Sequence, residues 1–329
     1  MSAMAMNPLG SMPAEEFLLY YWQKRPLLVR GAWKKFKPPV DGDELAGLSL
    51  EDEVESRLVI GPDHIVEFGP FSADRFNHLP NDQWTLLVQA VNLWVPEVHT
   101  MLDEFCFLPS WRIDDVMVSY ACKGGGVGPH YDDYDVFLLQ GKGQRRWQIS
   151  AGECEPNAPL IAHQDLKILA DFRPDQELTL NEGDMLYLPP RWAHNGIALD
   201  ECITFSIGCR APSVGEMLDD LATEIIARGE QKYLRDPPLA PPKDSDEIQF
   251  NYIAEVKTLL LSVLNDDTLL AEWFAQYMTQ PKYPHLIELT HELRKATIKI
   301  PLANDDTTTK YQARTYCNAE RVENREVDD

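Results

Sequence analysis

The stretch GGGVGPHYDDYDVFLLQGKGQRRW, residues 124–147, concentrates the side chains that decide both the fold and the chemistry. One histidine and three aspartates lie between a glycine-rich start and two adjacent arginines. The apolar run DVFLLQ, residues 135–140, is typical of a buried strand. We expect the GKGQ turn that follows, residues 141–144, to return the chain as a second strand alongside that run.

Short apolar segments of the same kind fill residues 111–210. They are broken by glycine and proline and read VMVSYAC, YDVFLLQ, RRWQIS, DMLYLPP and ITFSIGC. Several strands at short intervals predict an antiparallel barrel or jelly roll. Residues 14–24 and the segments after Pro212 instead repeat apolar side chains at helical spacing. The sequence therefore predicts a mainly β fold, a barrel or jelly roll, with helical additions.

Composition restricts the classes of protein that the chain can represent. Its 329 residues are 44% hydrophobic and 25% charged, as in ordinary globular proteins. Apolar runs are too short to cross a bilayer, and the six cysteines form no CxxC pair, so we expect a cytoplasmic protein with reduced thiols and no membrane contact. The formal charge of −23 disfavours direct nucleic-acid binding and favours a basic protein partner.

A metal site is the strongest functional hypothesis in this stretch. Because side chains alternate across a strand, His130 and Asp132 are expected to project from one face. The best third ligand is His194 in GDMLYLPPRWAHNG, where the Gly183–Asp184 turn, a short strand and two prolines would deliver the histidine. Two histidines and one carboxylate leave three positions open on an octahedral metal, as in non-haem Fe(II) oxygenases.

The other nearby polar side chains are weaker ligand candidates. Asp133 and Asp135 lie at odd offsets from His130, so we interpret them as solvated or as hydrogen-bond partners within a hairpin. His163 is interpreted as a loop or surface histidine. Alternation predicts that one of Arg145 and Arg146 points into the barrel, where its guanidinium needs an anion such as a carboxylate. It does not tell which of the two arginines does so.

These segments resemble the JmjC-type ribosomal oxygenases, especially the bacterial enzymes that hydroxylate an arginine of a large-subunit ribosomal protein. The resemblance covers most of residues 14–215, including YWQKRPLLVRGAW, WTLLVQAVNLW, residues 108–147 and GDMLYLPPRWAHNGIAL. It implies a double-stranded β-helix that uses Fe(II), 2-oxoglutarate and O₂. It further implies a large-subunit ribosomal protein as the substrate partner and a homodimeric assembly.

The resemblance assigns roles to individual positions. Matched by position, the iron ligands are His130, Asp132 and His194, the 2-oxoglutarate contacts are Arg145 and Thr204, and the substrate arginine is held near Asp115, Met117 and Tyr134. The chain departs from the family pattern at two positions near the cosubstrate. Relatives tend to have Ser in place of Ala121 and Asn in place of Thr204, which should weaken cosubstrate binding without abolishing it.

The resemblance also predicts the domain organisation. We expect a JmjC catalytic domain with an N-terminal extension over 1–212, a helical dimerisation region over 213–280 and a shortened winged-helix-like module over 281–329.

Three alternative functions remain open at this level. The same chemistry could act on a histidine or asparagine side chain, or could demethylate N-methyl-lysine. A different class is a non-catalytic cupin-like protein that binds a metal or ligand without turnover. Stoichiometric succinate release from the Fe(II)-loaded protein would separate a catalyst from such a binder.

Overall fold

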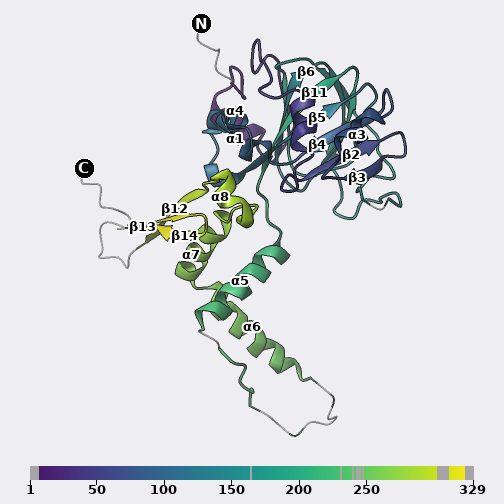
Figure 1. Ribbon diagram of the computed structural model, residues 1–329. Coiled ribbons are helices and arrows are strands. Elements are labelled where there is room, and N and C mark those ends of the chain that lie inside the picture. Colours follow the sequence, from purple (N-terminus) through teal and green to yellow (C-terminus); the bar gives the residue numbers. More distant parts are fainter. Residues whose placement is uncertain are drawn as a thin grey trace, which may run out of the picture. The chain divides into compact units, whose positions relative to one another are not determined.

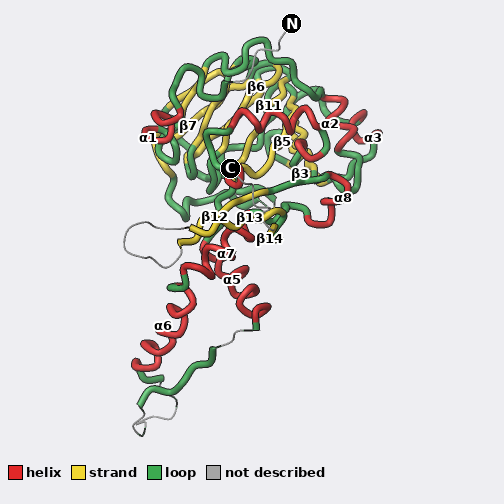
Figure 2. Tube along the Cα trace, turned by 90° about the vertical axis from the view of Figure 1, so that its left-hand side faces the viewer, coloured by secondary structure: helices red, strands yellow, loops and turns green. Residues whose placement is uncertain are grey.

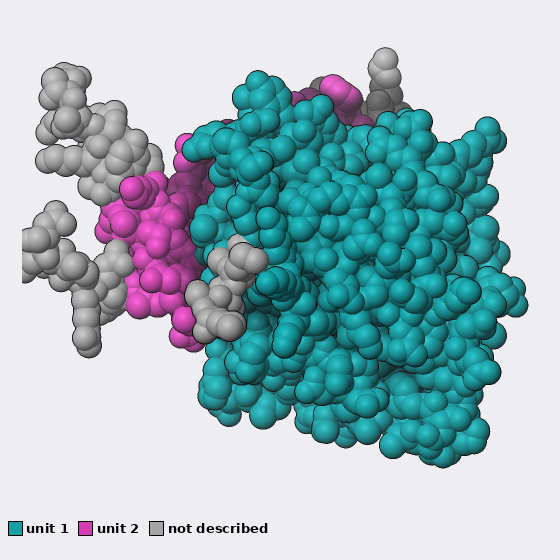
Figure 3. Space-filling view, turned by 90° about the horizontal axis from the view of Figure 1, so that it is seen from above, with its two compact units in different colours: residues 1–211, 285–292 teal, residues 212–284, 293–329 magenta. Residues whose placement is uncertain are grey.

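The structure is a computed structural model that describes residues 7–163, 165–229, 232–238, 241, 246, 248–301 and 311–322. Its residues group into two compact units, coloured teal and magenta in Figure 3. The barrel unit comprises Met1–Ala211 with His285–Glu292, and the helical unit comprises Pro212–Pro284 with Leu293–Asp329.

An eight-stranded antiparallel sheet forms the larger layer of the barrel unit. Its strand order is β1-β9-β6-β11-β5-β4-β2-β3, and most of these strands lie side by side in Figure 1. In chain order the strands are β1 Leu27–Val29, β2 Ser56–Ile60, β3 Ile65–Phe68, β4 Trp84–Val88, β5 Ile113–Ala121, β6 Val136–Lys142, β9 Met185–Leu188 and β11 Cys202–Cys209.

A three-stranded sheet of order β10-β7-β8 forms the second layer. Its strands are β7 Arg145–Glu153, β8 Gln176–Leu180 and β10 Trp192–Ala198. The two sheets share one apolar cluster with members from both, namely Val136, Leu138, Trp147, Ile149, Leu180, Leu186 and Leu188. Alternate residues of facing strands thus pack between the layers, as in a jelly roll. The expected fold class is confirmed.

One strand pairing differs from the expectation. The strand after the GKGQ turn does not return alongside β6, because β6 pairs with β9 on one edge and with β11 on the other. Both hydrogen-bonding edges of β6 are therefore occupied, and β7 joins the other sheet, where it pairs with β8 and β10. Gly143 makes this crossing possible, because its φ of +65° is unfavourable for other residues and an added Cβ would collide with the Glu201 carbonyl.

The outer face of the large sheet is covered by N-terminal elements. Helices α1 and α3 lie at the periphery of the barrel unit in Figure 2, where helices are red. Phe17 of α1 is fully buried, and its ring contacts those of Phe137 and Tyr187 on the sheet. Loss of such a buried ring typically costs about 3–5 kcal/mol. The N-terminal extension is therefore an integral part of the barrel core.

Short helices complete the barrel unit and its connections. They are α1 Ala14–Tyr20, α2 Gly42–Leu48, α3 Ala73–Asn77, α4 Pro96–Thr100 and α8 Ile287–Thr290, with 3₁₀ turns η1 Val91–Leu93, η2 Met101–Phe105, η3 Ser110–Arg112 and η4 Pro284–Leu286.

The helical unit contains three longer helices followed by a small sheet. These elements are α5 Val214–Arg228, α6 Phe250–Leu264, α7 Asp267–Met278, β12 Lys295–Pro301, β13 Tyr311–Cys317 and β14 Glu320–Val322. Helix α5 begins at a capping box formed by Ser213 and Glu216. The buried Trp273 of α7 donates its indole N–H to Asp220 of α5 at 2.7 Å, which joins the two helices. Residues 302–310 and 323–329 of the expected terminal module lie outside the described residues.

Among the described helices, none has the length and apolar character that crossing a bilayer requires. All six cysteines are free.

Candidate metal centre

The backbone joins the two histidines of the expected metal site. His130 donates its backbone N–H to the carbonyl of His194 at 3.0 Å, and His194 donates back at 2.8 Å. The carbonyl of Asp132 accepts the N–H of Arg191 at 2.6 Å. The His130–Asp132 segment is therefore fixed against the start of β10. This segment is not part of a continuous strand, since β6 begins only at Val136. The isolated bridge between His130 and His194 is what brings the two histidines together.

Three ligand atoms converge at this bridge. One donor atom from each of His130, Asp132 and His194 can be chosen so that all lie within 4.8 Å of one another. The Nδ1 atom of His130 bonds the Gly128 carbonyl at 3.0 Å, and that of His194 bonds the Trp192 carbonyl at 2.9 Å. Because a carbonyl only accepts, each Nδ1 must carry the hydrogen. The Nε2 lone pair of each imidazole is then available for a metal.

The electrostatics of the site also suit a cation. Burial first, and then the neighbouring His130, lower the pKa of His194 to about 4. The imidazole is therefore neutral at pH 7, the form that binds metals. Nε2 of His194 lies 3.7 Å from Oδ2 of Asp132, which is too long for a hydrogen bond. Two nitrogen lone pairs and a carboxylate converging on one point fit an Fe(II) ion.

Arg145 is the arginine that points between the sheets. Only 6% of Arg145 is exposed, and its Nε and one terminal nitrogen have no hydrogen-bond partner among the described residues. Arg146 points the other way, where its guanidinium lies 3.8 Å from Glu177. A buried guanidinium with unpaired donors is costly unless an anion binds there.

Arg145 and His194 share one face of the small sheet. The register pairs Arg145 with Ala198, Trp147 with Gly196 and Ile149 with His194. Directly paired residues point to the same side, so Arg145, Trp147 and His194 all face the large sheet. The Trp147 ring lies between them, 5.8 Å from the Arg145 guanidinium and 5.7 Å from the His194 ring. The candidate metal ligand His194 and the buried Arg145 guanidinium thus face the same interior.

The two positions that depart from the family pattern lie on the opposing face. Thr204 of β11 is buried and bonds Oε1 of Gln140 at 3.2 Å, so its hydroxyl is already partnered within the chain. Ala121 packs with Cys202 and Ala198, and Ala198 is the strand partner of Arg145. Both positions therefore line the same interior as Arg145, although no contact joins Thr204 to Arg145 directly.

Two of the three expected substrate contacts, Asp115 and Tyr134, approach one point on β11, and the third lies on the same strand as Asp115. Asp115 is 4% exposed, and its Oδ1 and the Tyr134 ring atom Cε2 each lie 3.8 Å from the point that a Cβ of Gly208 would occupy. Burial first, and then the nearby Asp132, raise the pKa of Tyr134 above its usual range. Met117 lies two residues beyond Asp115 on β5, on the same strand face.

Asp135 contradicts the expectation of a solvated or hairpin-bonded side chain. It is fully buried and accepts hydrogen bonds from the Tyr187 hydroxyl at 2.6 Å, Gln23 at 3.1 Å and Arg112 at 3.3 Å. Burial raises its pKa, although each of these partners lowers it. The odd offset does point Asp135 away from the metal, but N-terminal residues cover that face instead of water. No local sequence signal reveals this covering.

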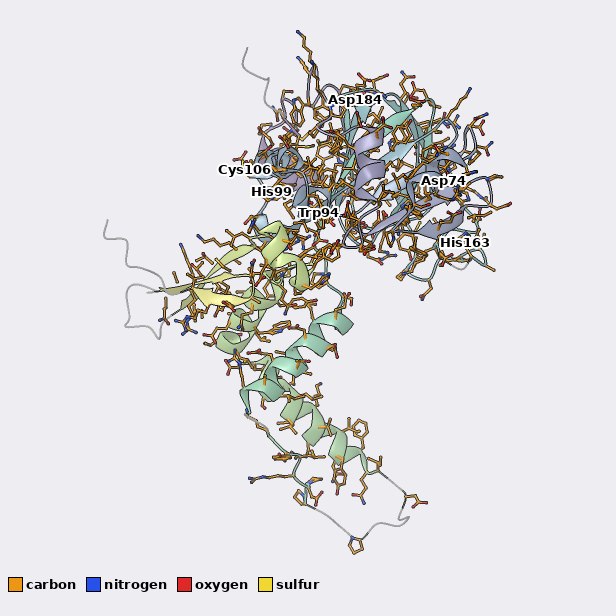
Figure 4. The ribbon with its side chains drawn as sticks, in the orientation of Figure 1. Asp74, Trp94, His99, Cys106, His163 and Asp184 are labelled. Atoms are coloured by element: carbon orange, nitrogen blue, oxygen red, sulfur yellow. The ribbon has the colours of Figure 1, made fainter. Side chains whose placement is uncertain are left out.

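The remaining candidates have simpler surroundings. Asp133 is exposed. His163 lies in a loop, where Nε2 bonds the His64 carbonyl at 3.0 Å and Nδ1 accepts two backbone N–H groups. In Figure 4 it lies on the opposite side of the barrel unit from His99.

Arg191 contributes to the site but was not predicted from the sequence. Its backbone N–H bonds the Asp132 carbonyl, and its φ of +64° marks an unusual turn.

Comparisons with known proteins identify relatives across most of the chain. A profile of the JmjC domain matches residues 100–217. The ribosomal protein uL16 3-hydroxylase of Escherichia coli (strain K12) is 37% identical over 271 residues, 82% of this chain and 72% of that protein. The probable ribosomal oxygenase of Haemophilus influenzae is 40% identical over 215 residues, 63% of this chain and 52% of that protein.

Solved structures agree with these sequence relatives. An X-ray structure of E. coli ycfD has a TM-score of 0.78 at 30% identity and covers 96% of this chain and 87% of its own. A structure of YcfD, a ribosomal oxygenase, in complex with cobalt and 2-oxoglutarate has a TM-score of 0.75 at 30% identity, with coverage of 96% and 86%. Together with the fold and the convergent ligands, these similarities show that the chain belongs to the JmjC-type ribosomal oxygenases.

Proposed function

We propose that this protein is an Fe(II)- and 2-oxoglutarate-dependent dioxygenase that hydroxylates the β-carbon of an arginine in a large-subunit ribosomal protein. The observation that carries this proposal is the shared interior face of the small sheet. It presents the candidate metal ligand His194 at one end and, at the other, the buried guanidinium of Arg145, two of whose nitrogens have no partner among the described residues. A 2-oxo acid with a second carboxylate matches these two ends. The relative named as a uL16 3-hydroxylase supports the substrate assignment.

Each group of residues has a distinct part in this proposal. His130, Asp132 and His194 would hold the iron through two Nε2 atoms and a carboxylate oxygen. Arg145 would pair with the far carboxylate of 2-oxoglutarate, while Thr204 lines the opposing face. The chemistry that bound iron supplies is O₂ activation, with decarboxylation of 2-oxoglutarate to succinate and transfer of one oxygen atom to the substrate.

The protein itself contributes orientation and exclusion of water. Asp115, Met117 and Tyr134 would hold the arginine side chain beside the metal ligands, with the Asp115 carboxylate binding the guanidinium. Asp132 lies close enough to Tyr134 to raise the pKa of its hydroxyl, so the expected substrate contacts adjoin the candidate metal-ligand carboxylate. The apolar cluster between the sheets keeps water from one side of the site.

The direct test is mass spectrometry of the purified ribosomal protein uL16 after incubation with this enzyme, Fe(II), 2-oxoglutarate and O₂. We expect a one-oxygen mass gain on an arginine and one succinate per product. A gain on histidine or asparagine, or loss of a methyl group from N-methyl-lysine, would transfer the proposal to an alternative substrate. No succinate above the level of an Asp132→Ala control would indicate a non-catalytic binder.

We also propose that the chain divides into a catalytic domain over 1–212, a helical region over 213–280 and a shortened winged-helix-like module over 281–329. The helical region would form a homodimer. Helix α6 has no buried residue and exposes apolar side chains at helical spacing, including Phe250 at 84%. Such a face is expected to be covered by a second copy. Light scattering should give twice the chain mass, and Ile253→Asp together with Leu260→Asp should give monomers. A monomeric wild type would contradict the proposal.

The charge of the chain bears on its partner as well. A formal charge of −23 attracts a basic protein and repels a phosphate backbone. The proposed contact is therefore with the ribosomal protein, without direct binding to nucleic acid.

A further inference from the structure

The segment WTLLVQAVNLW, residues 84–94, contains none of the candidate metal ligands but contacts Asp115, an expected substrate contact. Its first five residues form β4, which pairs with β5 only as far as Val88 opposite Val118. The chain then leaves the sheet at Gln89 and Ala90, and Ala90 adopts a φ of +50° before η1 begins. The part of β5 that carries Asp115 is therefore not paired with β4.

Beyond the end of the strand pairing, two side chains of this segment hydrogen-bond β5 instead. Asn92 is buried, and its Oδ1 accepts the backbone N–H of Val116 at 2.8 Å, as a neighbouring strand would do. The Nε2 of Gln89 donates to Oδ2 of Asp115 at 2.7 Å. The backbone of Gln89 is itself fixed, because its N–H donates to the Glu55 carbonyl at 2.9 Å. Asp115 is thus held through both its carboxylate and its strand.

The two oxygens of the Asp115 carboxylate face different surroundings. Oδ2 bonds Gln89, whereas Oδ1 lies 3.8 Å from the point that a Cβ of Gly208 would occupy, as does the Tyr134 ring atom Cε2. A hydrogen bond to one oxygen restrains the plane of a carboxylate, and with it the direction in which the other oxygen points. A guanidinium is planar and donates in fixed directions, so its binding depends on that plane more than binding of a point charge does.

We propose that Gln89 is a positioning residue for substrate recognition, which sets the plane of the Asp115 carboxylate so that it selects an arginine side chain. This inference rests on the proposed function, because it takes Asp115 to be the group that binds the substrate. Gln89 acts through Asp115, to which its amide donates. Asn92 supports the same strand from its backbone.

The test compares Gln89→Met with a matched control, Gln148→Met. Gln148 also donates to a carboxylate, that of Glu177 at 3.1 Å, but lies on the outward face of β7. Both variants keep the side-chain length and remove the amide. The probe is a synthetic uL16 peptide with one arginine, compared with the same peptide carrying neutral citrulline. Binding to the cobalt(II)- and 2-oxoglutarate-loaded protein is measured by calorimetry.

We expect Gln89→Met to weaken binding of the arginine peptide about tenfold, as for loss of one charge-assisted hydrogen bond. Binding of the citrulline peptide and 2-oxoglutarate affinity should stay near wild type, while the unfolding temperature should fall slightly, because the buried Asp115 carboxylate loses one hydrogen-bond partner. Gln148→Met should change none of these. In an Asp115→Asn background, Gln89→Met should have no further effect, because the coupling acts through Asp115.

Other outcomes overturn the inference in distinguishable ways. If Gln89→Met binds the arginine peptide as wild type does, Gln89 has no positioning role. If it weakens arginine peptide, citrulline peptide and 2-oxoglutarate by the same factor, its role is structural only. If the wild-type protein itself does not prefer arginine to citrulline, the arginine assignment of the proposed function fails before Gln89 is tested.

Discussion

Asp132 and Asp135 lie three residues apart and show opposite ways of accommodating a carboxylate. Asp135 is fully buried and bonded by a hydroxyl, an amide and a guanidinium. Asp132 is partly exposed and faces the imidazole nitrogens of two histidines, which offer lone pairs. Converging acceptors repel one another unless a cation lies between them. Polar groups whose hydrogen-bonding capacity is satisfied within the chain stabilise this fold, whereas polar groups that lack such partners mark the candidate chemical site.

The largest expected effect is on metal binding. Asp132→Ala should lower Fe(II) affinity by more than about 100-fold, since loss of even an outer partner of a metal ligand costs up to that factor. The free energy of unfolding should fall little, because Asp132 is partly exposed. Metal content after gel filtration and urea unfolding would measure the two quantities. Iron retention at the wild-type level would remove Asp132 from the ligand set.

The reverse pattern is expected at Asp135. Asp135→Ala should lower the free energy of unfolding by about 3–5 kcal/mol, because Arg112 and the Tyr187 hydroxyl lose a buried partner. The Fe(II) affinity of the folded fraction should stay near wild type. Asp135→Asn keeps the side-chain volume and serves as the milder control. If Asp135→Ala left stability unchanged but removed the iron, the contrast between the two carboxylates would be inverted.

The adjacent arginines allow a similar contrast at smaller magnitude. Arg145→Leu should weaken 2-oxoglutarate binding by about 1.5–3 kcal/mol, the range for a hydrogen bond to a charged group. Arg146→Leu removes the same charge from the outward face and should leave the affinity unchanged. Calorimetry of both variants with cobalt(II) present would compare them. Equal losses would mean that general charge, and not direction, controls the cosubstrate.

Tyr187→Phe should have the smallest effect. The Tyr187 hydroxyl donates to Asp135 and accepts the backbone N–H of Gln23 at 2.7 Å. Its loss leaves Asp135 with the Gln23 and Arg112 contacts, so the free energy of unfolding should fall by about 1 kcal/mol. Metal and 2-oxoglutarate binding should not change. A loss as large as that of Asp135→Ala would show that the hydroxyl alone stabilises the buried carboxylate.

The sequence predicts the parts of the site that depend on local pattern. Glycine and proline punctuation indicates the β fold, and alternation shows that one of two adjacent arginines faces inward. The resemblance to the family, not the spacing, favoured Arg145. Strand alternation predicted that His130 and Asp132 project together. In the structure these residues lie in an irregular segment, and a backbone bridge joins His130 to His194.

The missed features depend on which distant segments meet. Alternation tells that Asp135 points away from the metal, but not that Gln23 and Arg112 cover that face. Turn chemistry places a bend at Gly143, but the pairing of β7 depends on both edges of β6 being occupied. The bond from Gln89 to Asp115 spans 26 positions of the chain and follows no periodicity.

The most direct test of the central claim is a crystal structure of the protein grown with cobalt(II) and 2-oxoglutarate. We predict one metal ion bound by Nε2 of His130, Nε2 of His194 and a carboxylate oxygen of Asp132. The far carboxylate of 2-oxoglutarate should pair with the guanidinium of Arg145. A metal bound elsewhere, or a cosubstrate whose far carboxylate does not reach Arg145, would contradict this account of the site.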